Sequence, residues 1–130
     1  RVNFVVMVVG SPNSNFNFQF SIMKAHLRQI RISVNKANVV AGLIRGKNVD
    51  QALDILKFTP KKAADILYKV VASASANAQT NDSVSSDKLL IDEIIITRGS
   101  FWRRFLPSSR GRALPLRKPT CNISVHLSAK

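Results

Sequence analysis

The sequence lacks several features that common classes of protein need. It has one cysteine, Cys121, so no disulfide can form within the chain, and a reducing compartment is the simpler expectation. Its longest apolar run near the N-terminus, Phe4 to Val9, is far too short to span a bilayer. No spacing of His, Cys and carboxylate residues matches a metal-ligand pattern. A disulfide scaffold, a membrane span and a metal site are therefore not expected.

Acidic residues are few, and they are confined to the middle of the chain. Residues 1–49 contain seven basic residues and no acid, residues 50–97 contain all seven acids, and residues 98–130 contain eight basic residues and no acid. The net charge is +13. A folded domain this basic repels itself unless it binds a polyanion. Nucleic acid is the first candidate partner, and an anionic membrane surface is the second.

No arrangement of residues predicts catalysis. Asp50 and Asp54 stand one helical turn apart, which is typical of a solvated helix face. His26 and His126 are far apart in the chain, and we expect them at the surface or at strand ends. The sequence therefore predicts a binding protein, with no enzymatic activity, no cofactor and no small-molecule substrate.

Hydrophobic spacing predicts a single α+β domain over residues 25–130. Alternating residues predict strands at 26–32 and around 123–127, and β-branched residues predict another at 89–99. Helical spacing predicts three helices: one capped by Ser33 and ended by Gly46, one from Asn48 to Phe58, and one that Thr59 caps and that Asn81-Asp82-Ser83 ends. These elements predict an α+β fold of three helices packed on a small antiparallel sheet, to which the resemblance given below adds a long basic β-hairpin arm.

Residues 1–24 are predicted to be a variable extension. Apolar residues 2–9 are followed by the polar break 10–15, but a small-residue cleavage pattern and an Arg-rich amphipathic helix are both absent. A secretion or targeting segment is therefore less favoured, although the remnant of an organellar presequence stays open.

Residues 100–119 join two predicted strands without the Asn-Gly or Asp-Gly pair of a tight hairpin. Phe101, Trp102, Phe105 and Leu106 alternate there with basic residues, and there is no acid. Guanidinium groups pair with phosphate, and both they and aromatic rings stack on unpaired bases. The segment is either disordered or part of a two-stranded arm, over about residues 89–127, that a partner orders.

Basic residues also flank the predicted helices. Lys61 and Lys62 stand in the predicted first turn of the third helix, where the helix dipole disfavours cations and an external anion is expected. A general DNA-binding module is less favoured, because past that turn the helix has only Lys69. The candidate RNA-binding residues are Lys36, Arg45, Lys47, Lys61, Lys62, Arg98, Trp102, Arg103, Arg104, Arg110, Arg112, Arg117 and Lys118.

An ordered series of short motifs resembles ribosomal protein twenty-two of the bacterial-type large subunit. The resemblance covers about residues 28–127 and is carried by the series and not by any single motif. The motifs include Leu43-Ile44-Arg45-Gly46-Lys47, Gln51-Ala52-Leu53-Asp54-Ile55-Leu56, Lys61-Lys62-Ala63-Ala64, Ala76-Asn77-Ala78 and Arg110-Gly111-Arg112-Ala113.

The resemblance implies a structural constituent of the large ribosomal subunit. It implies an α+β body near the polypeptide exit and a hairpin that passes between rRNA segments and lines the nascent-peptide tunnel. The implied partners are large-subunit rRNA, neighbouring ribosomal proteins and the nascent polypeptide, in the bacterial cytoplasm or the mitochondrial matrix. The alternative is a basic protein that binds membrane surfaces. The implied hairpin tip comprises Arg104, Pro107, Ser108, Ser109, Arg110, Gly111 and Arg112.

Overall fold

The computed structural model describes residues 23–83 and 85–129, and most of the predicted extension lies outside these residues. Met23 and Lys24, which were assigned to the extension, belong to the first strand. The elements are β1 (Met23–Ile30), α1 (Val34–Ile44), α2 (Val49–Phe58), α3 (Lys62–Asp82), β2 (Leu89–Arg98), β3 (Trp102–Pro107), β4 (Ala113–Lys118) and β5 (Cys121–Ala129), with short 3₁₀ turns at Ser86–Lys88 and Ser109–Gly111.

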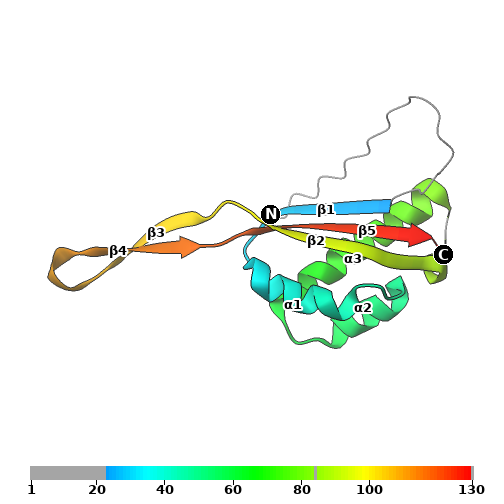
Figure 1. Ribbon diagram of the computed structural model, residues 1–130, viewed down its shortest axis with the longest axis horizontal. Helices are drawn as coiled ribbons and strands as arrows, with labels where there is room; N and C mark the ends of the chain where they lie inside the picture. The colour runs from blue at the N-terminus through cyan, green and yellow to red at the C-terminus, as the bar shows by residue number, and fades with distance from the viewer. Residues whose placement is uncertain (1–22, 84, 130) are drawn as a thin grey trace, which may run out of the picture.

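The body of the molecule is an antiparallel sheet covered on one face by helices. The strand order is β1-β5-β2, so the last strand lies between the other two. Figure 1 shows the three helices on one side of this sheet. Cys121, Ile123, Val125 and Leu127 alternate along β5 and are buried against the helices. The predicted α+β class is confirmed.

The third helix supplies more of the buried apolar residues than either of the other two helices. Apolar residues at helical spacing give α3 one continuous buried face, which matches the predicted stripe. Alanines at several of these positions let the helix approach its neighbours closely. The buried residues of this face are Ala63, Ala64, Leu67, Val70, Val71, Ala74 and Ala78.

The predicted start of the third helix was wrong. Thr59 does not cap α3, because its hydroxyl donates a hydrogen bond to the Ile55 carbonyl at 2.7 Å, and its N–H donates to the Leu56 carbonyl at 3.3 Å. These bonds make Thr59 the C-cap of α2. Lys61 has extended backbone angles and is the N-cap of α3, so the helix begins at Lys62.

The first strand also differs from its predicted bounds of 26–32. It begins at Met23 and ends at Ile30. Its pairing with β5 shifts register between Leu27 and Ile30, where Gln29 takes a positive φ of 55°. This irregularity stops the alternation before Ile32, which packs into the core from the connection to α1.

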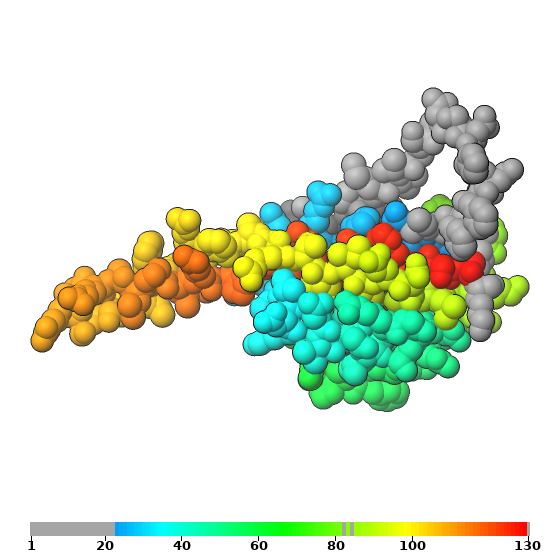
Figure 2. Space-filling model, in the orientation of Figure 1, coloured from blue at the N-terminus to red at the C-terminus, as the bar shows by residue number. Residues whose placement is uncertain are grey.

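The basic segment forms a two-stranded arm, as one of the two predicted alternatives had it. β3 and β4 pair antiparallel from Trp102 with Lys118 to Pro107 with Ala113. Figures 1 and 2 show the arm projecting from the body. The projecting part is shorter than the predicted 89–127, because residues 89–98 and 121–129 pair within the body sheet. At about 3.4 Å per residue, the six residues of β3 reach about 20 Å.

Candidate nucleic-acid interface

The arm joins the body through closely packed backbone. The Gly99 N–H donates to the Thr120 carbonyl at 2.9 Å, and the Thr120 hydroxyl donates to the Ser100 carbonyl. Thr120 is fully buried. Arg31, in the connection that follows β1, donates to the Pro119 carbonyl at 2.7 Å and so ties the base of the arm to the body.

One face of the arm places two arginines directly opposite each other. Arg103 pairs with Arg117 across the strands, and their guanidinium carbons lie 5.6 and 5.2 Å from the centre of the Phe101 ring. Like charges opposite each other on a sheet are destabilising. Because residues 98–130 contain no acid, the segment itself offers no carboxylate to compensate these charges.

The other face carries the only tryptophan of the chain. Trp102 is 47% exposed, so it is not a core residue. The guanidinium carbons of Arg31 and Arg104 lie 5.7 and 5.8 Å from its ring centroid. An exposed aromatic ring flanked by guanidinium groups offers a surface on which an unpaired base can stack.

The turn of the arm contains six of the seven predicted tip residues. The Ser108 N–H donates to the Arg112 carbonyl at 2.7 Å, and Arg110 and Gly111 take positive φ values of 58° and 70°. Arg104 lies apart from the turn, because it pairs with Leu116 in the middle of the ladder. The remaining predicted residues are Pro107, which ends β3, and Ser109, which begins the 3₁₀ turn.

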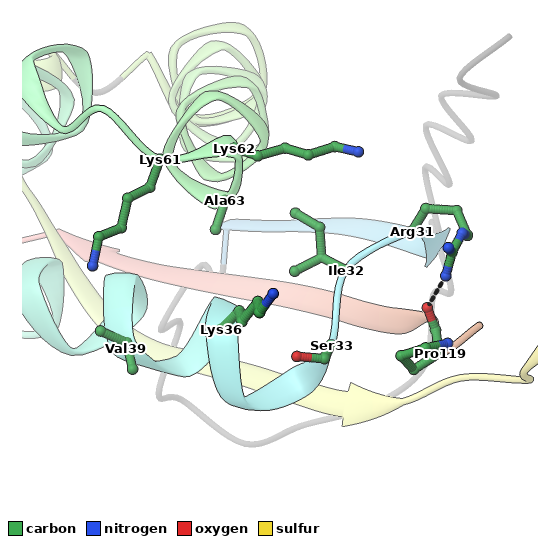
Figure 3. Close-up of a pocket in the computed structure, with 9 residues that line it drawn as sticks. All are labelled: Arg31, Ile32, Ser33, Lys36, Val39, Lys61, Lys62, Ala63 and Pro119. Atoms are coloured by element: carbon green, nitrogen blue, oxygen red, sulfur yellow. Dashed lines mark hydrogen bonds between the residues drawn. The ribbon is translucent and has the colours of Figure 1, made fainter. Parts of the chain in front are cut away.

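A second basic surface lies in a hollow of about 660 Å³ beside the base of the arm. Figure 3 shows Lys36 from α1, Lys61 and Lys62 from the start of α3, and Arg31 around this hollow. The residues that line it include no acid. Its other lining residues are Ile32, Ser33, Val39, Ala63 and Pro119.

The hollow brings together three predicted RNA-binding residues and a fourth residue, Arg31, that the sequence analysis did not predict to bind RNA. Lys36, Lys61 and Lys62 were candidates for RNA binding. Arg31 was assigned only to a strand, although it stands in an acid-free segment just before the predicted helix cap. Its contact with Pro119 joins positions 88 residues apart, so no local pattern in the sequence reveals it.

Three other predicted RNA-binding residues, Arg45, Lys47 and Arg98, lie in neither the hollow nor the arm. The Arg45 guanidinium donates to the Ile94 carbonyl at 2.9 Å and to Asn38 Oδ1 at 3.5 Å, so this side chain links the end of α1 to β2. Lys47 and Arg98 are exposed, in the α1–α2 connection and at the end of β2.

The two histidines meet across the exposed face of the sheet. His26 Nδ1 hydrogen-bonds with Ser124 Oγ at 2.8 Å, and the His26 and His126 rings pack edge to face with centroids 6.2 Å apart. Burial, then the nearby charges of His126, Lys24 and Arg28, lower the pKa of His26. Within the described residues no three His, Cys, Asp or Glu side chains gather as metal ligands would.

Two further absences concern the residues that the structure describes. None of their helices has both the length and the apolar character needed to cross a bilayer. Cys121 makes no disulfide, and burial raises the pKa of its thiol.

Comparison with known proteins places these features in a family. The family described as Ribosomal protein L22p/L17e matches residues 25–128. The chain is 45% identical over 107 residues to the large ribosomal subunit protein uL22 of Syntrophotalea carbinolica, covering 82% of this chain and 97% of that protein. It is 47% identical to uL22 of Clostridioides difficile, covering 82% and 96%. For uL22 of Lawsonia intracellularis the identity is 45%, covering 81% and 94%.

Proposed function

The chain belongs to the family of ribosomal protein L22p/L17e, and we propose that its arm binds large-subunit rRNA, orders that RNA during assembly and lines the nascent-peptide exit tunnel. As a member of this family, the protein is a structural constituent of the large ribosomal subunit and not an enzyme. Its partners there are rRNA and neighbouring ribosomal proteins.

The composition of the arm is the observation that carries the RNA-binding proposal. Both of its faces present aromatic rings flanked by guanidinium groups, and no carboxylate of the arm competes for them. Arginine binds phosphate through two parallel hydrogen bonds, and exposed rings stack on unpaired bases. Phosphate contacts would supply most of the affinity and make it dependent on salt, while stacking and shape would fix the register.

The reach of the arm supports its place in a tunnel wall. A hairpin that extends about 20 Å from the body can pass between RNA segments and present its turn to a space beyond them. Leu106 and Leu114, opposite each other near the turn, are 49% and 56% exposed. We propose that this end of the arm, from Leu106 to Leu114, faces the nascent polypeptide.

Sedimentation of a native lysate, with and without RNase, tests the assignment. The chain should migrate with the large subunit, and RNase should abolish this migration. Separate cytoplasmic and mitochondrial lysates identify the compartment. Recovery with membranes regardless of RNase would instead support a protein that binds membrane surfaces.

Matched variants test the arm as the RNA-binding element. The R110Q/R112Q variant should enter the subunit less efficiently than wild type. K57Q/K69Q is the control, because it removes the same charge from exposed positions on α2 and α3, outside the arm and the hollow. Equal incorporation of the two variants would contradict the proposed role of the arm.

A further inference from the structure

The hollow beside the base of the arm combines concentrated positive charge with an apolar floor. Ile32 and Ala63 are buried beneath it, and Lys36, Lys61, Lys62 and Arg31 surround it (Figure 3). The cations come from three separate parts of the chain: the β1–α1 connection, α1 and the start of α3. Their mutual repulsion is unfavourable, and a bound anion would relieve it.

Arg31 connects this hollow to the arm. Its guanidinium donates to the Pro119 carbonyl at 2.7 Å and lies 5.7 Å from the centre of the Trp102 ring. A guanidinium has further N–H donors in the same plane, so it can bind an anion while it keeps these contacts. The side chain that fixes the base of the arm is therefore also part of the wall of the hollow.

We propose that the hollow binds the phosphodiester backbone of RNA, and that Arg31 couples this binding to the position of the arm. This inference rests on the proposed function and extends it to a second site on the same chain. The volume of about 660 Å³ exceeds what a single phosphate group needs. The apolar floor suits the ribose units between phosphates, which a compact inorganic anion would leave uncovered.

Titration of the full chain with inorganic tripolyphosphate tests both parts of the proposal. Calorimetry measures the affinity, and Trp102 fluorescence measures the coupling, because Trp102 is the only tryptophan. Tripolyphosphate has no base and cannot stack on the ring, so a fluorescence change reports a guanidinium beside the ring, either Arg31 at the hollow or Arg104 on the arm. The R31K variant distinguishes the two. We expect a saturable change in Trp102 emission.

Three variants separate binding from coupling. In K36Q/K62Q the dissociation constant should rise about tenfold or more, because charge-assisted contacts are lost. In R31K binding should persist but the Trp102 response should shrink, because lysine lacks the planar fork that makes both contacts. K57Q/K69Q should behave as wild type. Equal dissociation constants for the two double-lysine variants would overturn the site, and a full response in R31K would overturn the coupling.

A short unpaired oligoribonucleotide identifies the source of the phosphate. It should displace tripolyphosphate from the wild type, and its log affinity should depend on log salt with a slope about 1.4 smaller in magnitude for K36Q/K62Q. Displacement by anionic lipid vesicles and not by RNA would overturn the RNA assignment.

The experiments distinguish a failure of the proposed RNA site in the hollow from a failure of the proposed function. If R110Q/R112Q loses incorporation into the subunit while K36Q/K62Q binds tripolyphosphate as tightly as wild type, the hollow proposal falls and the proposed function stands. If the chain does not sediment with the subunit, the proposed function is wrong, whether or not the chain binds tripolyphosphate.

Discussion

Substitution of Gly99 by alanine should destabilise the junction between body and arm. A Cβ at this position would lie 2.5 Å from Thr120 Oγ1 and 3.4 Å from the Thr120 carbonyl group. Thr120 is fully buried, and its hydroxyl is held by the Ser100 carbonyl, so the side chain cannot swing away without losing that bond. Among the glycines that the structure describes, positive φ values occur at Gly46 and Gly111, so Gly99 is needed for space and not for an unusual conformation.

The expected cost of G99A is about 1–3 kcal/mol, as for other substitutions that overpack an interior. T120A should cost about 0.5–1.5 kcal/mol through its lost hydrogen bond. The double variant should lose less than the sum, because the methyl group added at position 99 then occupies the space of the missing hydroxyl. We expect a favourable coupling of about 1 kcal/mol.

Urea unfolding followed by far-ultraviolet circular dichroism measures these free energies for the body. G42A is the matched control: apart from the chain neighbours and the backbone of its own helix, no described atom lies within 4 Å of the added Cβ, and Gly42 is inside α1. It should stabilise the protein by about 0.5–1 kcal/mol. A G99A protein within about 0.5 kcal/mol of wild type, or strictly additive effects with T120A, would refute the argument from crowding.

Other predictions concern the core and two titrating groups. L67A removes a fully buried side chain of α3 and should cost about 2–5 kcal/mol in urea unfolding; a smaller loss would mean that the site collapses. Partial desolvation, and the nearby carboxyl groups of Asp87 and Asp54, raise the pKa of the exposed Asp50, so its ionisation opposes folding as pH rises. D50N should therefore increase the Tm at pH 7 and not at about pH 3, below the carboxyl range. Burial and His126 lower the pKa of His26, so stability should fall below about pH 6.5. In the H26Q variant the Tm should decrease less as the pH falls, and a Tm profile equal to that of wild type would contradict this prediction.

Much of the body could be predicted because its signals are local. The stripe on α3 repeats at helical spacing, and β5 alternates cleanly, so each pattern identifies its own buried face. The start of α3 could not be predicted in this way. Thr59 is chemically able to cap the following helix, but its hydroxyl bonds the preceding helix at Ile55, and the choice depends on how α2 and α3 pack.

The candidate interface, too, could be predicted only in part, because some of its features are local and others depend on tertiary packing. Charge, and position at the predicted helices, identified Lys36, Lys61 and Lys62 as anion-binding candidates, but their gathering around one hollow depends on how α1 and α3 pack. The edge-to-face contact of His26 and His126 depends on the pairing of β1 with β5. Both arrangements join residues that are far apart in the chain, so no local sequence pattern predicts them.

The stability of the arm is the point at which fold and function depend on each other. A two-stranded hairpin alone is marginally stable in water, and this one adds a destabilising Arg103–Arg117 pair. Side chains along β3 remain exposed, so little apolar burial offsets these costs. The body fixes only the base of the arm, through Gly99, Thr120 and Arg31. We expect the proposed polyanion to supply further stabilisation, because phosphates between the arginines would turn their repulsion into attraction. We therefore expect the body to set the direction of the arm, and the proposed RNA partner to complete its order.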